Sequence, residues 1–112
     1  MGVEKTEKKE IEVIETKVLN LMHMARKAGN LQYGYDNCSY LCDVGRAKLV
    51  VYAEDLMEKT KTKLDRLLEE TGTEAICFGT KALYGNAFYT RETGIVIITN
   101  INFAKGINRL FV

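Results

Sequence analysis

The chain has 112 residues, of which 46% are hydrophobic and 28% are charged, and its formal net charge is +1. This length suits one compact domain, and a nearly neutral chain is unlike a strongly basic nucleic-acid-binding domain, so any basic surface must be local. No segment predicts a membrane span, and no apolar run near the start resembles a secretory signal. We therefore expect a cytoplasmic protein, a monomer rather than an oligomer, that does not bind membranes.

Charge is unevenly distributed along the chain. Residues 1–15 carry three lysines against five glutamates, whereas residues 16–53 carry five lysines and arginines against two aspartates. A segment of mixed charge with few apolar residues gains too little from packing to repay its ordering entropy. We predict an acidic, flexible leader over residues 1–12 and a single domain over residues 13–112.

The clearest periodic signal predicts the first helix, over residues 12–28. Its apolar residues recur at helical spacing from Ile14 through Val18 to Ala25, and Gly29 follows as a stop signal. His23 lies off this stripe and has no serine or cysteine at a spacing that would make a nucleophile–base pair. We expect it to be a solvated surface residue, without a catalytic role.

A short second helix is predicted after Gly34, with Asp36 or Asn37 as its N-cap and Gly45 as its end. Cys38 and Cys42 lie one turn apart on its apolar side. Two cysteines could hold a metal, but no further ligands accompany them, so we expect buried thiols and no metal or cofactor. The odd number of cysteines, without a CxxC pair, indicates free thiols in a reducing compartment.

Three short apolar runs, residues 49–53, 75–79 and 95–98, predict strands buried on both faces. Helices are predicted between and after them, over residues 58–70, around Leu83, and from an N-cap at Asn102. Alternation of helices and apolar strands predicts an α/β fold: a three-layer α-β-α sandwich with a mostly parallel sheet. An extra edge strand is possible near Gln32 and Tyr33.

In such a sheet, ligands bind beyond the carboxyl ends of the strands. That rule places Glu54, Gly79, Thr80 and Thr99 at one rim. The loops there contain neither GxGxxG nor GxxxxGK[ST], so no motif supports nucleotide binding. No nucleophile–base pair or metal cluster is present either, and we predict that the protein is not an enzyme.

Several blocks of the sequence, at their mutual spacing, resemble the kink-turn-binding ribosomal protein superfamily, of the large-subunit protein seven-Ae and thirty-e type. The resemblance runs from about Thr16 to Phe111, and the bacterial YlxQ/YbxF-type paralogues fit best. The blocks are Ala25-Arg-Lys-Ala-Gly29, Gly34, Gly45-Arg-Ala-Lys-Leu-Val-Val-Tyr-Ala-Glu-Asp55, Lys59-Thr-Lys-Thr-Lys-Leu64, Gly79-Thr80 with Gly85, and Phe103-Ala-Lys-Gly-Ile107. The resemblance implies the same α-β-α sandwich.

The resemblance also implies binding of ribosomal RNA or another kink-turn-like RNA, and it makes the ribosome a candidate partner. Family members recognise RNA with the N-terminus of the second helix, through the pattern G-x-N-E-x-x-K, and with a loop before the last strand. Here Asp36, Asn37 and Tyr40 stand at the Asn, Glu and Lys of that pattern. Nearby cations would contact phosphates, and exposed aromatic rings could stack on an extruded base. The expected RNA-binding residues are Lys27, Gly34, Asp36, Asn37, Tyr40, Arg46, Lys48, Tyr89 and Arg91.

These three replacements keep a second hypothesis open. Asp36 adds a negative charge near phosphates and Tyr40 removes a cation, so the chain could be a protein-interaction module of the same fold that has lost kink-turn binding. A positive patch around the start of the second helix would favour RNA, and an exposed apolar patch there would favour a protein partner.

Overall fold

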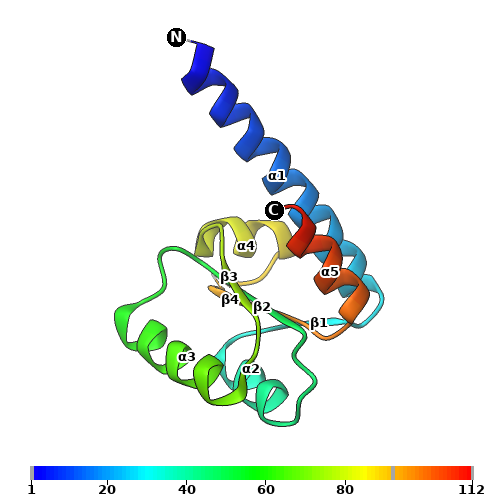
Figure 1. The fold of residues 1–112 in the computed structure, drawn as a ribbon, viewed down its shortest axis with the longest axis vertical. Coiled ribbons are helices and arrows are strands. Elements are labelled where there is room, and N and C mark those ends of the chain that lie inside the picture. Colours follow the sequence, from blue (N-terminus) through cyan, green and yellow to red (C-terminus); the bar gives the residue numbers. More distant parts are fainter. Residues whose placement is uncertain (1, 92, 112) are drawn as a thin grey trace.

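The computed structural model describes the backbone of residues 2–91 and 93–111, and side chains of these residues from Glu10 onward. In these residues the chain forms five helices and one four-stranded sheet (Figure 1). In chain order the elements are α1 (Gly2–Lys27), β1 (Leu31–Tyr33), α2 (Tyr35–Asp43), β2 (Leu49–Tyr52), α3 (Glu58–Thr71), β3 (Ala75–Cys77), α4 (Lys81–Phe88), β4 (Ile95–Ile98) and α5 (Ile101–Arg109). No helix in the described part is long and apolar enough to cross a membrane.

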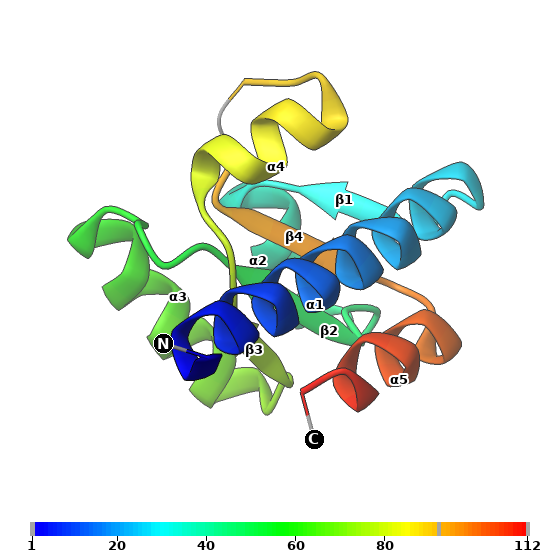
Figure 2. The same ribbon diagram turned by 90° about the horizontal axis from the view of Figure 1, so that it is seen from above.

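The predicted three-layer sandwich is confirmed. One core cluster joins α1, α4 and α5 to one face of the sheet, through residues such as Met22, Tyr84 and Ile107. A second cluster joins α2 and α3 to the other face, through Leu41 and Leu64. Figure 2 shows α1 crossing in front of the strands, with α2 behind them. Burial of β2 and β4 on both faces explains their uninterrupted apolar runs.

The sheet is mixed, so the prediction of a mostly parallel sheet is wrong. The strand order is β1-β4-β2-β3, and only β2 and β3 pair in parallel, while β4 is antiparallel to both of its neighbours. Apolar runs report burial and carry no information about strand direction. As a result, Thr99 lies at the opposite end of the sheet from Glu54 and Gly79. β1 is the expected extra edge strand, and β3 is an exposed edge strand rather than a buried one.

Helix α1 begins at Gly2, ten residues before the predicted start at residue 12. Lysine and glutamate both favour helix, so the backbone continues as a helix beyond the last core contacts. Figure 1 shows these first turns of α1 extending past the rest of the fold. They lie on the α1 side of the sheet, away from α2, so their backbone does not cover the start of that helix.

The cysteines are free thiols in the structure. Cys38 and Cys42 are buried in the second core cluster with their Sγ atoms 3.9 Å apart, and Cys77 is exposed on β3. Burial, reinforced by the neighbouring Cys42 thiol, raises the pKa of Cys38 to about 12. Among the residues that the structure describes, no group of three or more side chains could hold a metal ion. Burial in the second cluster makes Cys38 and Cys42 core residues, as predicted.

Candidate nucleic-acid interface

A cavity of about 340 Å³ opens where three helices begin. The first residues of α2, α3 and α4 line it together with the turn before β4. A hydrogen bond of 3.0 Å from the Gly34 amide to the Ile95 carbonyl holds the start of α2 against β4. The lining residues are Gly34, Tyr35, Leu56, Met57, Thr60, Lys81, Thr93, Gly94 and Ile95.

Two of these helices begin without a side-chain cap. The N-cap of α2 is Gly34, which has no side chain, and the N-cap of α3 is Met57, whose side chain accepts no hydrogen bond from the first turn. The α4 helix is capped twice: Thr80 Oγ1 accepts from the Leu83 amide at 3.1 Å, and Asp55 Oδ1 accepts from the Lys81 amide at 2.9 Å. First-turn amides carry partial positive charge and need acceptors. The starts of α2 and α3 are therefore available to the acceptors of a ligand.

Gly34 replaces the predicted N-caps Asp36 and Asn37, which lie inside the first turn of α2. Its backbone has φ 87° and ψ 163°, which only glycine adopts without strain. Asp36 is exposed, so its carboxylate favours the positive helix end but repels phosphates. Asn37 donates from Nδ2 to the Tyr33 carbonyl at 2.9 Å, so its amide group is tied to the edge strand and its oxygen remains an acceptor.

The aromatic side chains fall into two groups. Phe88 is 1% exposed and packs against the rings of His23 at 5.0 Å and Tyr33 at 5.5 Å, with Arg26 beside it. It is a core residue and cannot stack on RNA, and His23 is half-buried rather than fully solvated. By contrast, Tyr40 on α2 is 61% exposed and Tyr89 at the end of α4 is 94% exposed. These two rings are accessible to a ligand.

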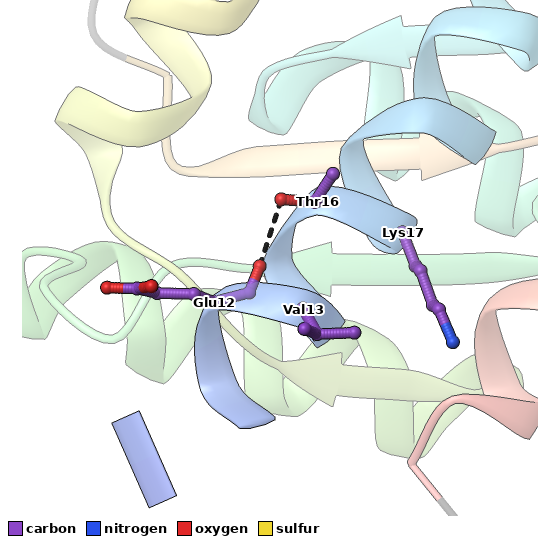
Figure 3. Close-up of a pocket in the computed structure, with 4 residues that line it drawn as sticks. All are labelled: Glu12, Val13, Thr16 and Lys17. Carbon is purple, nitrogen blue, oxygen red and sulfur yellow. Dashed lines mark hydrogen bonds between the residues drawn. The ribbon is translucent and has the colours of Figure 1, made fainter. Parts of the chain in front are cut away.

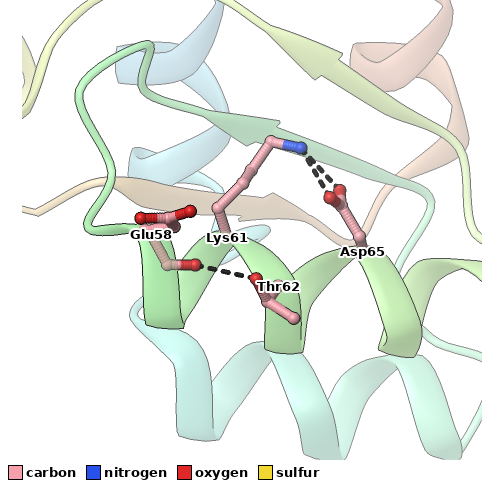
Figure 4. A network of polar contacts seen from close by, with 4 residues as sticks. All are labelled: Glu58, Lys61, Thr62 and Asp65. Carbon is pink, nitrogen blue, oxygen red and sulfur yellow. Dashed lines mark hydrogen bonds and ion pairs between the residues drawn. The ribbon is translucent and has the colours of Figure 1, made fainter.

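The lysines of α3 are partly engaged within the protein. Lys61 pairs with both carboxylate oxygens of Asp65, at 2.7 and 2.8 Å (Figure 4). Its Nζ also lies over the Tyr52 ring. The hydrogen bond to Asp65 raises the pKa of Lys61. Lys63 Nζ lies 4.6 Å from the centre of the Tyr35 ring, and both residues line a separate hollow between α2 and α3. Lys61 and Lys63 therefore already have partners within the protein.

The structure does not bring the predicted cations together. The Lys48 amide donates to the Ile98 carbonyl at the end of β4, and the Thr99 amide, just after β4, donates to the Asn30 carbonyl. The Gly34 amide instead donates to the Ile95 carbonyl at the start of β4. The two ends of β4 are about 10 Å apart. Lys27, Arg46 and Lys48 therefore lie at the opposite end of the sheet from the start of α2. Only Arg91, exposed in the connection before β4, is on the side of the cavity.

The sequence reasoning missed Lys81, the cation that lines the cavity, and the exposed side chain of Met57. A signal for Lys81 was present, because it follows Thr80 at the predicted rim and precedes Leu83, around which a helix was predicted. No such signal existed for Met57, whose apolar character favoured a buried position.

Comparisons with known proteins agree with this fold. The sequence matches the family described as "Ribosomal protein L7Ae/L30e/S12e/Gadd45 family" over residues 16–106. A search among curated proteins finds no match. A solved protein with unknown function from Bacillus halodurans superposes with a TM-score of 0.78 at 22% identity, covering 84% of this chain and 95% of that one. The Giardia lamblia 15.5kD RNA binding protein superposes with a TM-score of 0.70 at 19% identity, covering 88% of each chain.

Proposed function

The chain belongs to the ribosomal protein L7Ae/L30e/S12e/Gadd45 family, and from this premise we propose that it is a non-catalytic RNA-binding protein. Its ligand is a kinked or unstacked structured RNA, ribosomal or of kink-turn type, which it meets in the cytoplasm or on the ribosome. The similarity in fold to the Giardia lamblia RNA binding protein supports the proposal. The interface is the start of α2 together with the connection before β4.

One observation carries this proposal: α2 and α3 both begin, without a side-chain cap, at the cavity that Lys81 lines. Two positive helix ends and the Lys81 side chain converge on a space of about 340 Å³. Such a place suits phosphate oxygens and the acceptor edges of bases. A regular A-form duplex exposes few base edges to side chains, whereas a kink splays bases outward. The geometry therefore favours bent over straight RNA.

The individual roles follow from position. Gly34 lets the backbone turn so that the first amides of α2 face the RNA, while Asp36 and Asn37 offer oxygens to base donors. Tyr40 and Tyr89 offer exposed rings for stacking. Arg91 meets the phosphates of the RNA segment that approaches β4. In a second group, Lys27, Arg46 and Lys48 contact only RNA that continues past α2 to the far end of the sheet.

The test compares a kinked RNA duplex with a straight duplex of equal length and charge, in a mobility-shift titration over several salt concentrations. We expect tighter binding to the kinked RNA, and log K falling with log salt by roughly 0.7–0.9 per phosphate contacted. Lys81→Ala should lower that slope by about one. Lys105→Ala, an equal loss of charge on α5, should leave it unchanged. Equal binding of both duplexes, or none at low micromolar protein, refutes the proposal.

The alternative function is a protein-interaction module, and the composition of the cavity mouth favours it. Asp36 and Glu58 place carboxylates in the first turns of α2 and α3, and Met57 is 66% exposed beside them. Two acidic residues and an exposed apolar side chain suit a basic, apolar protein segment better than phosphate. Absence of binding to both duplexes in the same titration is the outcome that this alternative predicts.

A further inference from the structure

Helix α1 carries an exposed stripe beside the face that packs on the sheet. Its residues recur at alternating intervals of three and four, which keeps them on one side of a helix. All six are exposed, and Val13 and Met24 have 50% and 56% of their surface accessible to solvent. The stripe consists of Glu10, Val13, Lys17, Asn20, Met24 and Lys27.

The stripe is complementary to a second copy of itself that runs in the opposite direction. Its midpoint lies between Val18 and Leu19, and residues at equal distances from that point match in chemistry. The outer pair is an acid and a base, Glu10 and Lys27. Next inward are two apolar residues, Val13 and Met24. A single helix cannot use this match, because Glu10 and Lys27 lie about 26 Å apart along the axis. The match can be satisfied only between two helices that run in opposite directions.

We propose that two copies of this chain associate through the α1 stripes, antiparallel and around a two-fold axis beside Val18 and Leu19. Glu10 of each copy then faces Lys27 of the other, and Val13 faces Met24. In the centre, Lys17 donates to the Asn20 side chain of the opposite helix, which also separates the two Lys17 ammonium groups. A two-fold contact of this kind uses the same surface on both copies and closes at a dimer.

Free space and charge at the stripe support this occupant. A hollow of about 440 Å³ lies beside Glu12, Val13, Thr16 and Lys17, and Figure 3 shows Val13 and Lys17 pointing to one side of α1 while Glu12 points to the other. In the part of the chain with described side chains, neither Glu10 nor Lys27 forms an ion pair. Because α1 and α2 cover opposite faces of the sheet, pairing through α1 leaves the cavity at α2 open. The dimer would present two such cavities.

The contact is small. Stable interfaces bury roughly 1,200–2,000 Å² in total, and one pair of six-residue stripes provides less than that. Exposed ion pairs also add little. We therefore expect association that is detectable at hundreds of micromolar protein and reversed by salt. At the micromolar concentrations of an RNA titration the chain would remain a monomer.

A charge reversal with rescue tests the pairing by sedimentation equilibrium at low salt. Glu10→Lys and Lys27→Glu should each weaken dimerisation at least fivefold, because each places like charges opposite one another. The double variant restores opposite charges at both positions and should regain dimerisation. Glu69→Lys, an equal charge change at an exposed position of α3 on the opposite face of the sheet, is the control and should dimerise normally. Circular dichroism checks that each variant keeps its helix content.

Cross-linking fixes the register. In a Cys77→Ser background, Val13→Cys and Met24→Cys variants are mixed and treated with a short bis-maleimide. The expected product links position 13 of one copy to position 24 of the other, in large excess over links between two copies of position 13. No dimer at about 0.5 mM protein, no rescue in the double variant, or equal yields of the two cross-links would each overturn the proposal. The RNA titration is separate, so failure of the proposed RNA binding leaves this test intact.

Discussion

Replacing Gly34 by alanine should destabilise the fold, although the space for a methyl group is available. A Cβ atom built on Gly34 meets nothing within 4 Å, so the substitution creates no clash. The cost comes from the backbone, since φ 87° with ψ 163° lies in a region that only glycine populates readily. Such a conformation costs about 1–3 kcal/mol for other residues. Alanine also lowers the conformational entropy of the unfolded chain, which stabilises the fold by about 0.4–1 kcal/mol and offsets part of the backbone cost.

Gly106→Ala is the matched control. This glycine lies inside α5, and its Cβ would meet the Leu21 methyl groups at 3.5 and 3.7 Å, an ordinary contact. Alanine favours a helix interior over glycine by about 0.8–1 kcal/mol, so this variant should be more stable than the parent chain. Urea unfolding measures both, and for a small domain a net loss of 1–2 kcal/mol lowers the midpoint by roughly 1 M. A neutral Gly34→Ala would refute the assigned role of this backbone turn.

Three further predictions concern the helix cap and the thiols. Asn100→Ala should lower the free energy of unfolding by about 1 kcal/mol, because Asn100 Oδ1 accepts from the amides of Asn102 and Phe103. The control Asn102→Ala should change it by under about 0.5 kcal/mol. Equal effects of the two substitutions in urea unfolding would contradict this assignment. A maleimide should label Cys77 in the native protein and Cys38 only after unfolding, as mass spectrometry can show; early labelling of Cys38 would mean that α2 opens readily. Stability should fall as pH rises from about 9 to 12, because the unfolded chain loses the Cys38 proton at a lower pH than the folded chain does. Cys38→Ala should flatten that fall in a pH series of unfolding curves, and an unchanged slope would count against the raised pKa.

The layers of the fold could be predicted because buried positions are recognisable in the sequence from the spacing of apolar residues. The spacing of Val18, Met22 and Ala25 indicated one buried side of α1, and the apolar run of β4 indicated burial on both faces. The pattern of apolar residues does not depend on the direction in which a strand runs. The insertion of β4 between β1 and β2 therefore came only from the structure, and with it the true position of Thr99.

The candidate site was predictable in part for the same reason. The glycine at position 34 and the short helix after it were correctly placed, but side-chain type alone made Asp36 and Asn102 attractive as caps. Backbone geometry decides a cap, and the structure assigns Gly34 and Asn100. Grouping Lys27 and Lys48 with Gly34 assumed that nearness in sequence means nearness in space, whereas they lie at the other end of the sheet.

The most direct test of the RNA interface is a titration of the isotope-labelled protein with a kinked RNA, followed through its backbone amide signals. Tyr35 to Asn37 and Glu58 to Thr60 form the first turns of α2 and α3, the two helices that lack side-chain caps. We expect the largest shifts at these amides and small ones at Lys48 and Thr99. Dominant shifts at the far end of the sheet, or no shifts at saturating RNA, would contradict recognition at this cavity.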